Sequence, residues 1–188
     1  MHSIDYDLNL ITAPATEPVT LPEMRLWLKR PDNITADNDL ITSLIKFARV
    51  YVERYSKRAL FTQTWELISC YSPSKIDFPL GQLQSVESVI IVAEDGTEAT
   101  QVATLYSTTL DSDDGKLWLV SGQTWATTER DYDSFIVQFK CGWDDITKIP
   151  ENYKTAIKQI VTGLYDDRGW TDKDSYLRCQ QNAVGRLY

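Results

Sequence analysis

Histidine is almost absent from this chain, whose only copy is His2. This scarcity excludes the usual Ser-His-Asp and Cys-His catalytic sites, and it removes the commonest metal ligand. The sequence also contains no glycine-rich phosphate-binding motif of the form GxxxxGK[ST] or GxGxxG. We therefore predict no catalytic residue, no cofactor site and no metal site.

Cysteines are few, and Cys70, Cys141 and Cys179 lie far apart without a CxxC pair. This pattern favours buried thiols in a reducing compartment over a disulfide framework or a zinc site. No run of apolar residues approaches the length of a membrane-spanning helix, so we expect no membrane span. The opening MHSIDYDLNL lacks the positive start and the apolar run of a secretory signal.

Clusters of positive charge are also missing, because no basic run exceeds two residues and the net charge is −8. An ordinary nucleic-acid binder neutralises phosphates with clustered Lys and Arg, so this class is disfavoured. Apolar residues make up 43 % of the chain, which is enough to build a core. We expect a folded protein of one domain, with room for a sizeable insertion.

The longest amphipathic segment covers residues 37–60. Its apolar residues recur at three- and four-residue steps in two adjoining rows, which predicts a helix packed against a core. Asp37 or Asp39 is expected to cap its start. The apolar positions of the segment are Leu40, Ile41, Leu44, Ile45, Phe47, Ala48, Tyr51, Val52 and Tyr55.

Two shorter helices are predicted on either side of it. Thr20 and Glu23 form a capping box, with Pro22 in the first turn, and Pro31 ends the run that follows. The last helix begins at Pro150 and is expected to end at 167–169. Its apolar positions are Tyr153, Ile157, Ile160, Val161 and Leu164.

Residues 62–147 change to the two-residue period of β-strands. Asp95-Gly96 is a hairpin signal, and residues 102–106 are the expected return strand of that hairpin. The other expected strands are 62–69, 76–80, 86–93, 116–120 and 135–140. Helices before and after strands predict the α+β class. The expected domains are a discontinuous helical bundle at 18–61 plus 148–188, made of two N-terminal helices and a C-terminal helix, and an inserted antiparallel β module at 62–147.

Both chain ends carry more apolar residues than a solvated tail needs. Residues 1–17 are interpreted as an extended arm, and the sequence leaves open whether it lies on a neighbouring subunit or on its own domain. The candidate subunit-contact residues of this arm are Ile4, Tyr6, Leu8 and Leu10. Residues 170–188 are too sparsely apolar for an independent core, so we expect them to dock on something.

Three groups of acids resemble sites only superficially. Asp111, Asp113 and Asp114 precede Gly115, but a calcium loop needs a glutamate where this chain has Gly122. The pairs Asp144-Asp145 and Asp166-Asp167 are interpreted as turn and capping residues rather than a general acid and base. The large aromatics Trp27, Tyr51, Trp65 and Trp118 are all expected in the core.

The order of several motifs resembles one family, the head–tail connector, or adaptor, proteins of tailed bacteriophages and related gene-transfer particles. The resemblance covers roughly residues 17–168, and its most distinctive piece is Arg58-Ala-Leu-Phe-Thr-Gln-Thr-Trp65. The other motifs are Glu17-Pro-Val-Thr-Leu-Pro-Glu23, Asp39-Leu-Ile-Thr-Ser-Leu-Ile45, Phe78-Pro-Leu-Gly-Gln-Leu-Gln-Ser-Val86, Phe139-Lys-Cys-Gly-Trp143 and Ile149-Pro150.

This resemblance implies a non-enzymatic structural subunit of the virion neck, which is present in the host cytoplasm during assembly. About a dozen copies would form a ring beneath the portal protein, closed by rotation. The ring would extend the channel through which DNA passes without specific binding, and it would carry the stopper or tail-completion protein. In several such adaptors the C-terminal segment reaches the portal. The candidate portal contacts here are Tyr176, Leu177, Val184, Arg186, Leu187 and Tyr188.

Three other functions remain open from the sequence. The first is a tail-completion or other neck protein on the tail side of the same particle. The second is a small metal-dependent hydrolase or nuclease that uses Asp and Glu pairs, which the scarcity of histidine disfavours. The third is a host-encoded binding module.

Overall fold

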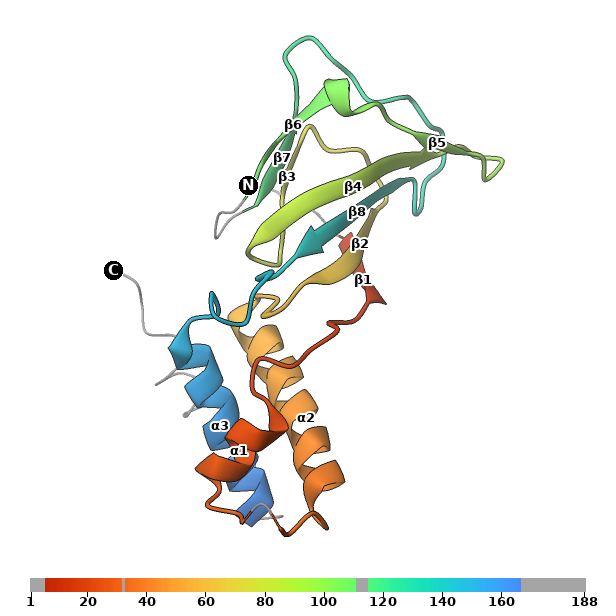
Figure 1. Cartoon of the computed structure of the whole chain (residues 1–188). Coiled ribbons are helices and arrows are strands. Elements are labelled where there is room, and N and C mark those ends of the chain that lie inside the picture. Colours follow the sequence, from red (N-terminus) through yellow and green to blue (C-terminus); the bar gives the residue numbers. More distant parts are fainter. Residues whose placement is uncertain (1–5, 32, 111–114, 167–188) are drawn as a thin grey trace. The chain divides into compact units, whose positions relative to one another are not determined.

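The computed structural model describes residues 6–31, 33–110 and 115–166. The chain divides into two compact units. Figure 1 colours the ribbon by residue number, so the segments that make up each unit can be followed there. The β unit combines the chain up to Pro14 with Thr62–Gly142, and the helical unit combines Ala15–Phe61 with the chain from Trp143 onward. Three helices and antiparallel sheets confirm the predicted α+β class. No helix of the described residues is long and apolar enough to cross a membrane.

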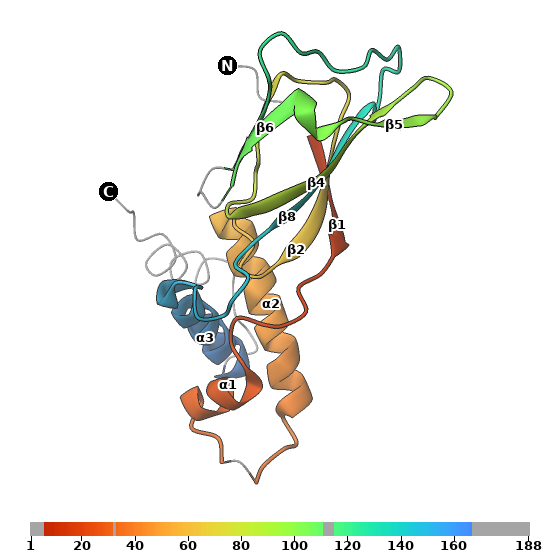
Figure 2. The ribbon, with the colours of Figure 1, turned by 45° about the horizontal axis from the view of Figure 1, so that its top comes forward.

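The helical unit contains α1 (Leu21–Trp27), α2 (Asn38–Ser56) and α3 (Glu151–Asp166). Figures 1 and 2 show α2 and α3 side by side in opposite directions, with α1 against the same pair. The helices meet through one buried apolar cluster, in which the predicted faces of α2 and α3 supply most of the side chains. Its fully buried members include Met24, Ile41, Ile45, Ala48, Val52, Leu60, Ile157, Ile160 and Val161.

The helix ends correct part of the sequence prediction. Thr20 caps α1 as expected, because its Oγ1 accepts from the Glu23 backbone N–H at 3.4 Å. Asp37 occupies the N-cap position of α2 but makes no side-chain cap bond, so the predicted carboxylate cap is wrong. Helix α2 also ends at Ser56 rather than near Leu60, because Lys57 adopts the left-handed conformation with φ 53°.

Removal of the α1 cap gives a first prediction. The Thr20→Ala variant is expected to lose about 1 kcal/mol of unfolding free energy, because the Glu23 N–H loses its side-chain acceptor. Urea titration followed by circular dichroism measures the loss. The control is Thr35→Ala, in an exposed loop, which should lie within about 0.5 kcal/mol of the original protein.

The β unit contains a five-stranded antiparallel sheet in the order β1-β2-β8-β4-β5 and a three-stranded sheet in the order β3-β7-β6. The strands of the first sheet are β1 (Tyr6–Thr12), β2 (Gln63–Ser69), β8 (Phe135–Cys141), β4 (Leu83–Val92) and β5 (Glu98–Thr100). Those of the second are β3 (Lys75–Asp77), β7 (Lys116–Leu119) and β6 (Tyr106–Thr109), and a short 3-10 turn, η1 (Ala103–Leu105), precedes β6.

Strand β8 supplies the middle of the β-unit core. Phe135, Val137 and Phe139 alternate along it and are fully buried, as the predicted period requires. The Phe139 ring lies 4.6 Å from the ring of Phe78, and the Trp125 ring lies 5.4 Å from that of Phe135. These ring contacts join the large sheet to the segments around the second sheet.

Two strand predictions are corrected by the pairing. The return strand of the Asp95-Gly96 hairpin is β5, not residues 102–106, which instead hold η1 and the start of β6. The turn at Gly96 needs a positive φ of 85°, so the chain returns immediately and Glu98 already pairs with Val92. The strand expected over 76–80 is shorter and shifted to β3, because Pro79 cannot donate to a ladder.

Residues 6–12 of the predicted N-terminal arm form β1 and lie in the chain's own sheet. Tyr6 pairs with Ser69, Leu8 with Leu67 and Leu10 with Trp65. Of the two alternatives that the sequence left for this segment, the structure has the second. The physical reason is the apolar–polar alternation of the segment, which matches the pleat of β2.

Candidate interaction surfaces

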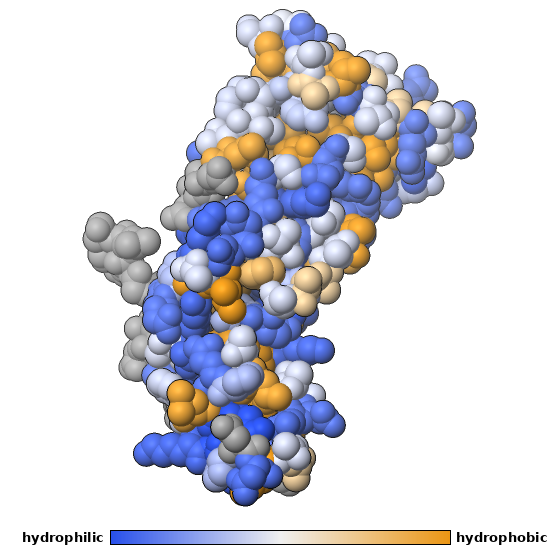
Figure 3. All heavy atoms as spheres, in the orientation of Figure 1, coloured by the Kyte–Doolittle hydropathy of each residue, from blue (hydrophilic) through white to orange (hydrophobic). Residues whose placement is uncertain are grey.

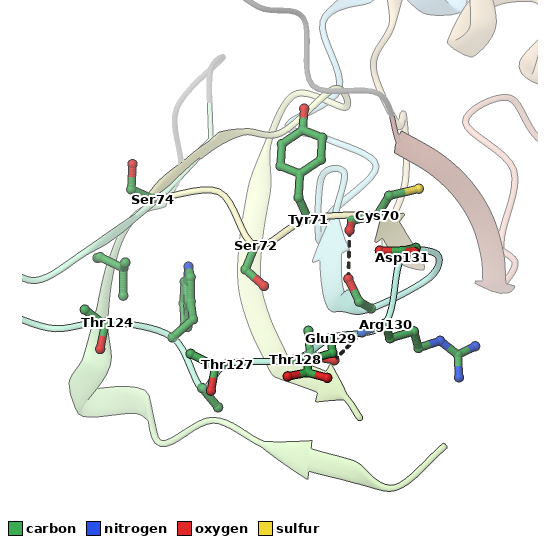
Figure 4. A pocket seen from close by; sticks show the side chains of 14 residues that line it. Cys70, Tyr71, Ser72, Ser74, Thr124, Thr127, Thr128, Glu129, Arg130 and Asp131 are labelled. Atoms are coloured by element: carbon green, nitrogen blue, oxygen red, sulfur yellow. Dashed lines mark hydrogen bonds between the residues drawn. The ribbon is translucent and has the colours of Figure 1, made fainter. Parts of the chain in front are cut away.

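A hollow of the β unit lies between the segment that follows β2 and the segment that precedes β8. Figure 4 shows Cys70, Tyr71, Ser72 and Ser74 on the first segment and residues 124–131 on the second. The hollow measures about 590 Å³. Its lining is rich in hydroxyl groups, which makes it the first place to look for chemistry.

Polar side chains of this hollow bind the two segments to each other and to the end of β4. Ser134 Oγ donates to the Cys70 carbonyl at 2.9 Å, the bond that Figure 4 draws as a dashed line. Thr128 Oγ1 donates to the Val92 carbonyl at 2.8 Å, and Trp125 Nε1 donates to the Pro73 carbonyl at 2.8 Å. These bonds satisfy main-chain carbonyls beside the hollow and help to fix the shape of the β unit.

The cysteines and acids are placed in part as predicted. Cys141 is buried, but Cys70 is exposed because the chain leaves the sheet there, so the prediction of a buried thiol is wrong for Cys70. Asp144 pairs with Lys148 at 2.8 Å, and Asp145 accepts from the Thr147 N–H at 2.7 Å, as turn residues do. No group of three His, Cys, Asp or Glu among the described residues could hold a metal ion.

The helical unit contains a nearly buried ionic network centred on Arg49. The Arg49 Nε donates to Glu17 at 2.8 Å, and its Nη1 donates to Glu53 at 2.5 Å. The other oxygen of Glu53 accepts from the Leu60 backbone N–H at 2.9 Å. Only 10 % of the Arg49 side chain is exposed. The network therefore ties the segments that enter and leave the helical unit to the middle of α2.

A second polar cluster fixes the start of α2 against the end of α3. Asp37 accepts from the Tyr165 hydroxyl at 2.7 Å and from the Arg30 guanidinium at 2.5 Å. The Tyr165 bond, with the Arg30 charge added, holds the pKa of Asp37 below its usual value. The same bond to Asp37 raises the pKa of Tyr165. The Asp37 carboxylate therefore binds Tyr165 and Arg30 and does not cap α2.

The lowered pKa of Asp37 gives a second prediction. A carboxylate with a depressed folded pKa stabilises the fold above its unfolded pKa of about 3.9, and this stabilisation is lost as the pH falls through the folded value. The Asp37→Asn variant is expected to show a shallower loss of stability than the original protein below about pH 4. Urea midpoints measured from neutral to acid pH test this. Parallel curves for both proteins would contradict it.

An exposed apolar stripe runs along the outside of α2. Leu40, Phe47 and Val50 are 45 %, 49 % and 37 % exposed, and the Phe47 ring stacks on Tyr51 at 6.4 Å. The sequence placed Leu40 and Phe47, but not Val50, in the rows expected to pack against the core. A helix of this length in a three-helix unit buries only one side. Three cations flank the stripe and make no ion pair with any described residue: Lys46, Arg54 and Lys57.

A second exposed apolar group lies at the end of α1. Leu26 is 80 % exposed and Trp27 is 46 % exposed, although Trp27 was expected in the core. Figure 3 shows apolar groups of this kind among hydrophilic ones on the helical unit. The Trp27 Nε1 donates to Thr162 at 3.1 Å, and the Lys158 amino group lies 5.5 Å from the ring centre. A hollow of about 440 Å³ adjoins this group.

Lys158 is held at this place by two carboxylates. It pairs with Glu23 at 2.7 Å and with Glu151 at 3.5 Å. Burial alone would lower the pKa of Lys158, but these two acids outweigh it and raise the pKa. Lys158 therefore stays charged and joins α1 to α3 beneath the Trp27 ring.

The predicted contact residues at the chain ends are only partly placed. Tyr6, Leu8 and Leu10 lie in β1, which is an edge strand of the sheet that the described residues form, and Leu10 is exposed. Ile4 falls outside the described residues. So do the six candidate portal contacts, Tyr176, Leu177, Val184, Arg186, Leu187 and Tyr188.

Comparison with protein families gives one match. The model of the family described as phage gp6-like head-tail connector protein matches residues 18–117, which is more than half of the chain. The match begins just before α1 and ends in β7, so it includes residues from both units. None of the curated proteins compared matches the chain.

Solved structures of similar fold come from gene transfer agent (GTA) particles. One chain is from the neck of an empty GTA particle computed with C6 symmetry; its TM-score is 0.77 at 16 % identity, with 93 % of this chain and 94 % of that chain covered. A chain of the native GTA virion has a TM-score of 0.75, with the same identity and coverage. A chain of the native neck computed with C12 symmetry has a TM-score of 0.70 at 15 % identity, with 93 % of both chains covered. At such identities the likeness is one of fold.

Proposed function

Because this chain belongs to the phage gp6-like head-tail connector family, we propose that it is a structural subunit of a ring at the neck of a virus-like particle. The observation that carries the proposal is the family match, together with a fold shared over 93 % of the chain with GTA neck chains. Those neck structures were computed with C6 and C12 symmetry, which supports an arrangement of repeated copies around an axis.

The position of the ring follows from the family resemblance. The ring would lie beneath the portal protein, extend the DNA channel and carry the stopper or tail-completion protein. Residues 176–188 are the proposed portal contact. A ring closed by rotation joins one face of each subunit to a different face of the next. All copies then point the same way, so the ring has two different ends, one for the portal and one for the tail side.

The charge of the chain fits a channel through which DNA slides. With a net charge of −8 in each copy, a ring would repel DNA rather than hold it. The Ser134 and Thr128 hydroxyls donate to the main-chain carbonyls of Cys70 and Val92. This structural use of the hydroxyls supports a non-enzymatic role. Lysines placed at acidic positions of the channel wall should slow DNA ejection, and an unchanged ejection rate would count against a repelling wall.

Deletion of the gene tests the proposal. Without this protein the heads should still fill with DNA, but they should lack tails. Complementation with the original gene is the control and should restore the tails. If filled heads still carry tails after deletion, the chain is not the connector. The alternatives to test next are a neck protein on the tail side and a small metal-dependent hydrolase.

A further inference from the structure

We propose that neighbouring copies of this chain bind each other through their helical units, with the outer face of α2 on one copy against the end of α1 on the next. This inference rests on the proposed ring and names the two surfaces that would close it. The two surfaces are the exposed face of α2 around Ser43 and the group formed by Leu26 and Trp27.

The outer face of α2 lies on the side that α1 leaves uncovered. The segment before α1 lines one hollow together with Thr42 and Ile45, and Glu17 binds Arg49 on the same side. At about 100° per residue, Leu40, Ser43 and Val50 point away from these positions. Leu40 and Val50 are large apolar side chains in water, and covering them with protein is favourable.

The end of α1 offers a rigid apolar counterpart. Leu26 is the most exposed of the large apolar side chains described, and the neighbouring hollow leaves room beside it. Trp27 is held in place by its bond to Thr162 and by Lys158 near its ring. A fixed, partly exposed tryptophan beside a hollow is typical of the residues that dominate protein interfaces.

The two surfaces lie at the same level of the helical unit. The Tyr165 hydroxyl binds Asp37, so the C-terminal half of α3 lies beside the N-terminal half of α2. Trp27 is bonded to Thr162 in that half of α3, while Leu40 and Ser43 belong to that half of α2. Copies related by rotation about an axis along the helices would bring the two surfaces together, as a heterologous ring contact requires.

The charges at the other end of the helices are complementary in this arrangement. Arg54 and Lys57 lie at the C-terminal end of α2 and make no ion pair with a described residue. At the same level, the turn before α3 carries Asp144 and Asp145, and α3 begins with Glu151. The side chains of Asp144 and Glu151 are 63 % and 68 % exposed. The cations of one copy would therefore face the acids of the next, which favours one register and direction.

The rival partner for this face is DNA, because Lys46, Arg54 and Lys57 also suit phosphates. The apolar Leu40 and Val50 among the cations favour protein. If the outer face of α2 bound DNA and made no contact with a neighbouring copy, the proposal would be overturned. This face would then line the DNA channel.

Crosslinking in assembled particles tests the contact. We would combine Ser43→Cys with Leu26→Cys in a background of Cys70→Ser and Cys179→Ser, and treat purified particles with a short bismaleimide. Multimers larger than a dimer are expected only when both new cysteines are present, since each copy then links to two neighbours. Each single variant should remain monomeric. The matched control, Ser43→Cys with Val102→Cys on the exposed surface of the β unit, should also give no multimers.

The outcomes separate this inference from the proposed function. Particles that carry a ring of this protein but yield no multimers would overturn the contact and leave the function intact. Dimers from Ser43→Cys alone would indicate a symmetric contact between two α2 faces and would also overturn it. Particles without any ring would contradict the proposed function itself.

Charge reversal supplies a second test of the contact, measured with the same crosslinking. Arg54→Glu should lower the crosslinked fraction about two- to fivefold, and adding Glu151→Lys to the same chain should restore it. Rescue supports the pairing of these ends. A loss that Glu151→Lys deepens would contradict the proposed register.

Discussion

Replacing Arg49 with methionine is expected to lower the unfolding free energy by about 3–5 kcal/mol. The substitution keeps much of the side-chain volume but removes the guanidinium that binds both Glu17 and Glu53, whose side chains are 20 % and 11 % exposed. Both carboxylates, neither of them well exposed, would lose their bonds to this guanidinium. Arg49 also helps to hold the Glu53 carboxylate in the position where it accepts from the Leu60 N–H, so that hydrogen bond would weaken.

Chemical denaturation followed by circular dichroism measures this loss. The matched control is Arg54→Met on the same helix, where the arginine is exposed and the change should lie within about 0.5 kcal/mol. A double variant, Arg49→Met with Glu53→Gln, should recover part of the loss because one buried charge is removed. An Arg49→Met protein as stable as Arg54→Met would show that the network contributes nothing.

Replacing Phe139 with alanine is expected to cost about 3–5 kcal/mol. Phe139 is fully buried in the middle of β8, and its ring contacts Phe78 at a centroid distance of 4.6 Å. The cavity would open between β8 and the segment that follows β3, where both sheets of the β unit contribute side chains. Little can collapse into it, because β8 is paired on both sides.

The control for this cavity is Val102→Ala, since Val102 is 61 % exposed and its truncation should change stability by less than about 0.5 kcal/mol. Phe139→Leu should fall between the two, because it refills part of the volume. Equal stability of Phe139→Ala and Val102→Ala would mean that the β unit has no shared core at this position.

The sequence predicted the regular elements well wherever one side of an element is buried. The rows through Ile41, Ile45, Ala48 and Val52 predicted α2, and the alternation through Phe135, Val137 and Phe139 predicted β8. Both patterns follow directly from the period of the backbone. The capping box at Thr20 was also readable, since it needs only two residues at fixed spacing.

Long-range partners were not readable from the sequence. Asp37 carries the signature of an N-cap, but Tyr165, 128 positions away, and Arg30 take its carboxylate. Arg49 and Glu53 look like an ordinary surface pair on a helix, and only the fold brings Glu17 to the same guanidinium. The pairing of β1 with β2 was equally hidden, because an alternating edge segment fits any complementary strand.

Interaction surfaces were missed for a related reason. Trp27 and the outer row of α2 have helical spacing, which predicts a buried face as readily as an interface. Only the exposure of Leu26, Leu40 and Val50 in the folded structure separates a buried face from an interface. The family resemblance rested on the order of motifs, and the family match over residues 18–117 confirms it.

The most direct test of the central claim is an electron-microscopy reconstruction of the neck in particles made with and without this protein. We predict a ring of repeated copies below the portal that disappears with the gene, leaving DNA-filled heads without tails. An unchanged neck density in the absence of the protein, with tails still joined to normal heads, would contradict the assignment.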